Sequence, residues 1–291
     1  MADRYQLLAA IGEGGMGTVW RARDLRRDVD VAVKLLRREV AEPTLVLRFM
    51  REARESARLQ HPSIVRTLDF ATTSGGEPFM VMELLRGRTL ANRLDAETRI
   101  PPREAVALLL PIVSALAVAH RAGVVHRDVK PENVFLVESS DGSVRPVLMD
   151  FGLAKVGQTA SGRCLTERYA LVGTPEYMSP EQFSGEEDID GRSDVWSLCV
   201  MLYEVLAGWR PFPSDEPLAL FAAVIARRPP MLDELCAADA RLSAIVERGL
   251  AKSPEDRWSS MHELGAALAQ WSRPTPSCAR ASASPRRGFA W

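Results

Sequence analysis

The sequence changes character near Gly87, and this change limits the folds that the chain can adopt. Before it, glycine-containing turns separate short β-branched runs, LLAAIGEGG, GTVWRARD, VDVAVKLL, SIVRTLDF and PFMVMEL, which predict a small antiparallel sheet. After it, long apolar segments predict helices over 102–121, 193–207, 217–225 and 242–250. We therefore expect an α+β protein with a strand-rich first part and a larger, mainly helical second part.

Two further segments have a distinct composition. Residues 43–60 carry apolar side chains at helical spacing among many charges, which predicts one helix inserted in the sheet, and His61-Pro62 ends it. The last twenty residues, 272–291, are rich in serine, proline, alanine and arginine without periodicity. Such a composition predicts a disordered tail or linker.

Composition argues against several classes of protein. With 291 residues and a net charge of −1, the chain has no overall positive field, so no nucleic-acid partner is expected. Cys164, Cys199, Cys236 and Cys278 stand far apart, which predicts reduced cytoplasmic thiols rather than a zinc site or disulfides. The most apolar run, 105–119, is shorter than the roughly 20 residues that span a bilayer, so we interpret it as a buried helix and expect no membrane segment.

Lysine is rare in this chain. Only Lys34, Lys130, Lys155 and Lys252 are lysines among the 37 basic residues. Because arginine is a wide fork and lysine a compact point charge, each remaining lysine suggests a chemical requirement that arginine does not meet.

The stretch GEGGMGTVW places Gly12, Gly14 and Gly17 in a GxGxxG pattern, which occurs both in dinucleotide-binding folds and in phosphate-binding hairpins. A dinucleotide fold needs a helix at the third glycine and an acid about 20 residues later, for which Asp30 is a candidate. The residues after Gly17 instead have the composition of two strands joined by a charged turn. This favours a hairpin whose backbone N–H groups face phosphates.

Six motifs then occur in one order: GxGxxGxV at 12–19, VAVK at 31–34, Glu52 in the predicted helix, HRDVKPEN at 126–133, DFG at 150–152 and GTPEYMSPE at 173–181. This order resembles the eukaryotic-like serine/threonine protein kinases over nearly all of residues 5–271, and the GEGGMG loop is most similar to the bacterial branch. The resemblance implies a bilobal kinase fold, with an ATP-binding N-terminal lobe over 1–85 and a catalytic C-terminal lobe over 86–271.

The resemblance gives the residues of HRDVKPEN roles in moving a phosphoryl group from ATP to serine and threonine hydroxyls of protein substrates. Asp128 would orient the hydroxyl and accept its proton, and Lys130 would lie near the transferring phosphate. Asn133 and Asp150 would hold Mg²⁺, or Mn²⁺ in its place. A turn aspartate held by local hydrogen bonds is the structural alternative for Asp150.

On the nucleotide side, the resemblance implies that Lys34 contacts the α and β phosphates and pairs with Glu52. A helix acid that only faces water is the alternative for Glu52, since Glu55 lies on the same predicted helix. The further residues implied around ATP are Ile11, Gly12, Gly14, Gly17, Val19, Ala32, Met82, Glu83 and Leu85. Met82 would guard the back of the adenine pocket and Glu83 to Leu85 would form the hinge, although methionines at such spacing are also common in cores.

Other motif residues are implied to support the catalytic loop. Glu181 and Arg257 resemble the buried ion pair of the family, and Asp194 resembles the aspartate that accepts hydrogen bonds from the loop backbone. His126 is expected to orient the loop rather than to bind metal or act as a base. These roles are structural.

The resemblance also implies regulation through residues 152–175. Arg127 and Lys155 would bind a phosphate on Thr166, which is favoured over Thr159, Ser161 and Tyr169 as the site of autophosphorylation within a transient homodimer. Thr174 would contact Asp128 and Lys130 on the substrate side.

A pseudokinase that binds nucleotide or serves as a scaffold is the alternative function. It predicts loss of Lys34, Asp128, Asn133 or Asp150, and all four are present. The chain departs from the family pattern at Cys199, where glycine is usual, and at Ser179, where alanine is usual. Both departures exchange one small residue for another.

Overall fold

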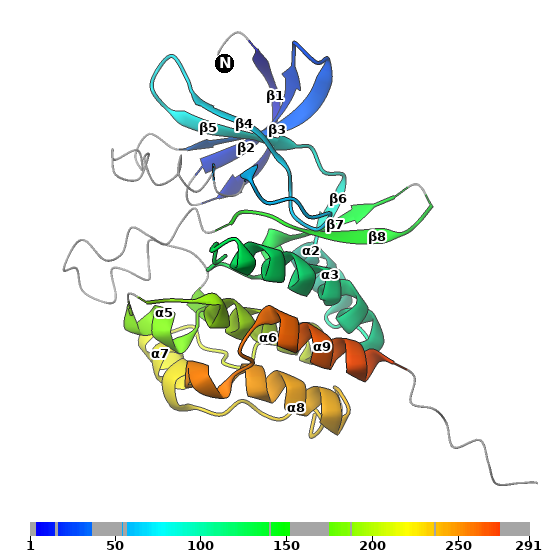
Figure 1. Ribbon diagram of the computed structural model, residues 1–291, viewed down its shortest axis with the longest axis vertical. Helices are drawn as coiled ribbons and strands as arrows, with labels where there is room; N and C mark the ends of the chain where they lie inside the picture. The colour runs from blue at the N-terminus through cyan, green and yellow to red at the C-terminus, as the bar shows by residue number, and fades with distance from the viewer. Residues whose placement is uncertain are drawn as a thin grey trace, which may run out of the picture.

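The computed structural model describes residues 4–14, 17–36, 54, 57–139, 141–151, 175–186, 188–235 and 237–273. Its N-terminal part is a five-stranded antiparallel sheet in the order β1-β2-β3-β5-β4, at the top of Figure 1. The strands are β1 (Tyr5–Gly14), β2 (Gly17–Asp24), β3 (Val29–Leu36), β4 (Thr67–Thr72) and β5 (Pro78–Glu83). Each of the five β-branched runs that predicted a strand contributes residues to this sheet.

Side chains alternate across β3 and β5, and this alternation decides what faces the rest of the molecule. Val31 and Val33 are buried with Tyr5 on one face of the sheet. Ala32 and Leu36 are buried in a separate cluster with Met80 and Met82 of β5. Because successive residues of a strand point to opposite faces, Lys34 lies on the same face as Ala32 and Leu36.

The C-terminal part is mainly helical. Among the described residues its helices are α2 (Leu90–Glu97), α3 (Pro102–Arg121), α5 (Pro180–Ser184), α6 (Gly191–Ala207), α7 (Pro217–Ala226), α8 (Ala240–Gly249) and α9 (Met261–Ser272), with short 3-10 turns η2 (Pro131–Asn133), η3 (Pro175–Tyr177) and η4 (Pro254–Asp256). The four helices predicted from periodicity correspond to α3, α6, α7 and α8. Nearly every residue of α6 is buried, as expected of a helix that is covered on all sides.

A second, three-stranded sheet lies between the two parts (Figure 1). It contains β6 (Gly87–Thr89), β7 (Val134–Glu138) and β8 (Val144–Leu148), and the sequence reasoning did not anticipate it. The turn before β4 pairs with β8, because Leu148 N–H donates to the Ser63 carbonyl at 2.9 Å and Val65 N–H donates to the Leu148 carbonyl at 3.0 Å. These bonds tie the first sheet to the strand that leads into Asp150.

Helix α3 is the one helix among the described residues with the length and apolarity to span a bilayer, at 20 residues and a mean hydropathy of 1.6. It packs against α6, α9 and β8, and half of its most apolar window is buried. Ala105, Leu109, Ile112 and Leu116 are fully buried. This is the packing of a core helix, as the run 105–119 predicted.

Candidate active site

The catalytic-loop motif follows α3 and closes around the carboxylate of Asp128. Lys130 Nζ lies 3.0 Å from Asp128 Oδ2, and Asn133 Nδ2 donates to the same oxygen at 2.9 Å. Asn133 Nδ2 also donates to the backbone carbonyl of Asp128 at 2.8 Å. Lys130 and Asn133, both predicted from the motif, therefore meet at the carboxylate of Asp128, the third predicted residue.

His126 is fully buried behind this carboxylate and holds two segments together. Its Nδ1 accepts from the Asp128 N–H at 3.2 Å, and its Nε2 donates to the Met149 carbonyl at 2.9 Å. Burial lowers the pKa of His126 against the opposing effect of the Asp194 charge, so the ring is neutral. A neutral ring with its proton on Nε2 meets both partners, which is an orienting arrangement and leaves no nitrogen for a metal.

Asp194, near the start of α6, fixes the backbone before Asp128. Its Oδ2 accepts from the His126 N–H and its Oδ1 from the Arg127 N–H, both at 2.8 Å. The Nε2 of His120 lies 2.7 Å from Asp194 Oδ2. His120 was not singled out from the sequence. The available signal was a histidine in the last turn of a mainly apolar helix, α3.

Lys34 and Asp150 meet where the first sheet faces the second part. Lys34 Nζ lies 2.6 Å from Asp150 Oδ1, and the two side chains are 13% and 32% exposed. Asp150 has a positive φ of 54°, which is costly for a residue other than glycine. The Met149 N–H donates to the Asn133 carbonyl at 2.8 Å, so the segment carrying Asp150 is joined to the catalytic loop.

Four of the residues predicted to surround the nucleotide share one apolar cluster, on the face of the sheet that carries Lys34. Ala32 and Met82 are buried in one apolar cluster, against which Val19 and Leu85 pack. Gly17 has no room for a side chain, since a Cβ there would lie 1.9 Å from the Leu35 carbonyl oxygen. The remaining residues of this set are placed as follows: Ile11 is 52% exposed, Gly12 and Gly14 lie on β1, and Glu83 ends β5.

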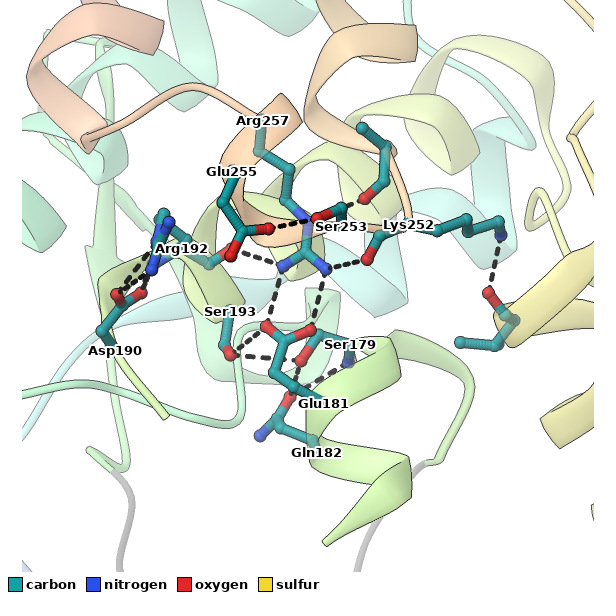
Figure 2. Close-up of polar contacts among 12 residues, drawn as sticks. Ser179, Glu181, Gln182, Asp190, Arg192, Ser193, Lys252, Ser253, Glu255 and Arg257 are labelled. Atoms are coloured by element: carbon teal, nitrogen blue, oxygen red, sulfur yellow. Dashed lines mark hydrogen bonds and ion pairs between the residues drawn. The ribbon is translucent and has the colours of Figure 1, made fainter. Parts of the chain in front are cut away.

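A buried ion pair joins Glu181 of α5 to Arg257, which follows η4 (Figure 2). Arg257 Nη1 and Nη2 each donate at 2.8 Å to one carboxylate oxygen of Glu181, and their side chains are 0% and 6% exposed. Burial acts to raise the pKa of Glu181, but the hydrogen bonds and charge of Arg257 outweigh it and the pKa is lowered. Ser193 Oγ, which the sequence analysis did not single out, donates to Glu181 Oε1 at 2.5 Å.

Four predicted site residues lie outside the described residues: Glu52, Lys155, Thr166 and Thr174. Sequence reasoning also missed Gln182, whose amide reaches the catalytic loop from α5. The spacing of Ser179 and Gln182 is that of a capping box, S-x-x-Q, which was the signal that could have found it.

Comparison with known proteins places the chain in a family. The model of the protein kinase domain matches residues 5–267. The chain is 41% identical over 274 residues to the serine/threonine-protein kinase PknB of Mycolicibacterium smegmatis and 38% identical over 274 residues to the serine/threonine-protein kinase pkn3 of Myxococcus xanthus. The chain therefore belongs to the protein kinase domain family, and the resemblance seen in the motifs is confirmed.

The comparison of structures agrees. The crystal structure of the Mycobacterium tuberculosis PknI kinase domain matches with a TM-score of 0.73 and 29% identity, covering 91% of this chain and 95% of that one. The α+β protein kinase fold is thus confirmed. Each match to PknB and pkn3 covers 92% of this chain but only 43% and 50% of the relative, so the chain spans half or less of their length.

Proposed function

We propose that this chain is a serine/threonine protein kinase domain that transfers the γ-phosphate of ATP to hydroxyl groups of protein substrates. The observation that carries the proposal is the convergence on Asp128: Lys130 at 3.0 Å and Asn133 at 2.9 Å from one carboxylate oxygen. The names of the relatives point to the same activity. A scaffold without catalysis would have no use for this arrangement.

In the proposed reaction the chain positions groups rather than forming a covalent intermediate, because phosphoryl transfer passes through a loose, highly charged transition state. The carboxylate of Asp128 orients the substrate hydroxyl and accepts its proton. Lys130, already beside Asp128, supplies positive charge near the transferring phosphate. Lys34 orients the α and β phosphates from β3.

The residues present fit a divalent metal with ATP. Asp150 offers a carboxylate and Asn133 an amide oxygen, the hard oxygen ligands that Mg²⁺ prefers and that Mn²⁺ also accepts. A metal bound there neutralises phosphate charge. The apolar cluster of Ala32, Met82 and the packed Leu85 suits an adenine ring, and we assign its binding to residues 1–85 and catalysis to 86–271.

The test is phosphate transfer from labelled ATP with magnesium to a serine- or threonine-containing protein, compared between the parent and Asp128→Asn. Asn is similar in shape but does not accept the proton as a carboxylate does, so transfer should fall by about 100-fold or more. Equal rates would overturn the assignment of Asp128. Absence of transfer in the parent, with ATP still bound, would favour the scaffold alternative.

The proposal includes activation by autophosphorylation in a transient homodimer. Arg127 precedes Asp128 and would bind a phosphate on Thr166 together with Lys155. Mass spectrometry after incubation with magnesium and ATP should find phosphate on Thr166 in the parent but not in Asp128→Asn, and Thr166→Ala should lose activity. Thr174→Ala should lose activity even where Thr166 carries phosphate, because its proposed role is contact with Asp128.

We also assign the domain to the cytoplasm. ATP is available there, and the buried free thiol of Cys199 stays reduced in that compartment.

A further inference from the structure

Gln182 lies in α5, the short helix that follows the GTPEYMSPE motif, and both ends of its side-chain amide have partners. Its Oε1 accepts from the Ser179 backbone N–H at 3.1 Å and lies 3.3 Å from Ser179 Oγ. Its Nε2 donates to the backbone carbonyl of Arg127 at 3.0 Å. The residue is 8% exposed, so the amide is shielded from water.

The chemistry of the partners decides which way this amide points. The Ser179 N–H is only a donor and needs an oxygen, whereas the Arg127 carbonyl is only an acceptor and needs an N–H. Figure 2 shows the amide oxygen toward Ser179 and the nitrogen pointing away from the network around Glu181. Ser179 Oγ in turn lies 3.1 Å from Ser193 Oγ, which holds the cap in place.

The backbone that Gln182 contacts is strained. Arg127 has a φ of 63°, in the left-handed region that side chains other than glycine rarely adopt. Its N–H is held by Asp194 at 2.8 Å and its carbonyl by Gln182 at 3.0 Å. A strained conformation persists only where its surroundings hold it, and here α6 holds one side of the residue and α5 the other.

We propose that Gln182 is a positioning residue for Asp128. The Arg127 carbonyl belongs to the peptide unit whose nitrogen is that of Asp128, so a hydrogen bond to this carbonyl orients the residue that accepts the substrate proton. The inference rests on the proposed kinase function. It also identifies a direct polar link from α5, at the end of the GTPEYMSPE motif, to the catalytic loop.

The experiment compares the parent with Gln182→Glu, which keeps the shape and the acceptor but removes the N–H donor. We expect kcat to fall by about tenfold or more, since misplacing a catalytic group by about 1 Å can cost 100-fold. The KM for ATP should stay within about twofold because the Lys34 side of the site is untouched. Gln270→Glu, an exposed change on α9 with the same chemistry, should leave kcat and KM unchanged.

Two measurements separate positioning from a general loss of structure. Burial raises the pKa of an introduced carboxyl, and the protonated form regains a donor, so the deficit of Gln182→Glu should shrink as the pH falls. The neutral Gln182→Met should show a deficit that does not change in this way. Hydrogen exchange of segment 124–133 should quicken in both variants, and the thermal midpoint of the neutral Gln182→Met should stay close to that of the parent.

Parent-like kcat together with parent-like exchange in 124–133 would overturn the role of Gln182. If Gln182→Glu does not fold, Gln182→Met decides the question with the same two measurements. A parent that transfers no phosphate would overturn the proposed function, whereas the exchange measurement would still decide whether Gln182 holds the loop.

Discussion

The ion pairs Lys34–Asp150 and Glu181–Arg257 have similar lengths, but their surroundings differ. Lys34 and Asp150 meet at 2.6 Å with side chains that are 13% and 32% exposed. Glu181 and Arg257 meet at 2.8 Å with 6% and 0% exposed. Arg257 uses all five of its N–H donors, with further bonds to the carbonyls of Arg192, Lys252 and Ala251 at 2.8–3.0 Å.

The difference teaches what each pair is for. A buried pair with every polar atom matched stabilises the arrangement of the helices it joins, and removing one partner leaves a charge in a place without water. The pair of Lys34 and Asp150 is partly exposed, so water can solvate the charge that remains when one partner is removed, and its loss should cost less stability. In the proposed reaction each charge of the Lys34–Asp150 pair has another use, Lys34 for phosphates and Asp150 for a metal. Loss of either charge should therefore reduce activity rather than prevent folding.

The largest expected effect is on the buried pair. Arg257→Leu should lower the free energy of unfolding by about 3–5 kcal/mol, because Glu181 is left charged and unpaired in the interior. Denaturant unfolding of the parent and the variant measures this. Combining it with Glu181→Leu should recover part of the loss, since no buried charge then remains. If the double variant is no more stable than Arg257→Leu, the loss of stability comes from lost packing and not from an unpaired buried charge.

Lys34→Met should reduce activity strongly and stability little, the reverse of what we expect for Arg257→Leu. Transfer should fall by about 100-fold or more, because the phosphates lose an orienting charge, while the free energy of unfolding should change by less than about 1 kcal/mol. Arg21→Met, which removes an exposed ion-pair partner on the neighbouring strand, serves as control and should retain activity. Near-parent transfer by Lys34→Met would remove the contrast between the two pairs.

A smaller effect is expected in the packing beside Arg257. A Cβ on Gly249 of α8 would lie 2.1 Å from Cys199 Sγ on α6, so Gly249→Ala should cost about 1–3 kcal/mol of stability. Cys199→Gly removes the obstacle, and the double variant should be more stable than Gly249→Ala alone. Thermal unfolding of the four proteins gives the coupling, and additive effects would show that the two positions are independent.

The smallest effect concerns a third pair of intermediate burial. Asp24 is 2% exposed, and its pKa is lowered from 3.8 to about 2, first by the hydrogen bond from Arg4 and further by the N–H groups of Arg26 and Arg27, against the effect of burial. As the pH falls, the unfolded chain takes up this proton first, so the stabilisation is present above about pH 4 and is lost toward about pH 2. In Asp24→Asn the unfolding midpoint should depend less on pH over this window than in the parent. An equal pH dependence in the two proteins would contradict the lowered pKa of Asp24.

The sequence predicted the first sheet, helices α3, α6, α7 and α8, and the motif residues because each has a local signal. It did not predict β6 to β8 or helices α2, α5 and α9. Strand β6 has three residues, and they pair with residues of β7 that lie 46 to 50 positions further along the chain, so no local pattern identifies it. Lys252 is a second example of this limit. Lysine is rare in the chain, which singled out Lys252, but the sequence indicated no role for it. In the structure its Nζ donates to the Val224 carbonyl at 2.6 Å and lies 4.1 Å from the ring centre of Phe212, and burial lowers its pKa to about 8.

The sequence by itself determined the family, the α+β class and the chemical types of the site residues, because motifs with fixed spacing record which groups the chemistry needs. Tertiary structure decided how these groups are held. His120 and Asp194 lie 74 residues apart and Gln182 and Arg127 lie 55 apart, yet each pair is joined by a hydrogen bond. Such contacts arise where α3, α5 and α6 pack beside the catalytic loop, and a linear pattern carries no record of which distant polar groups that packing brings together.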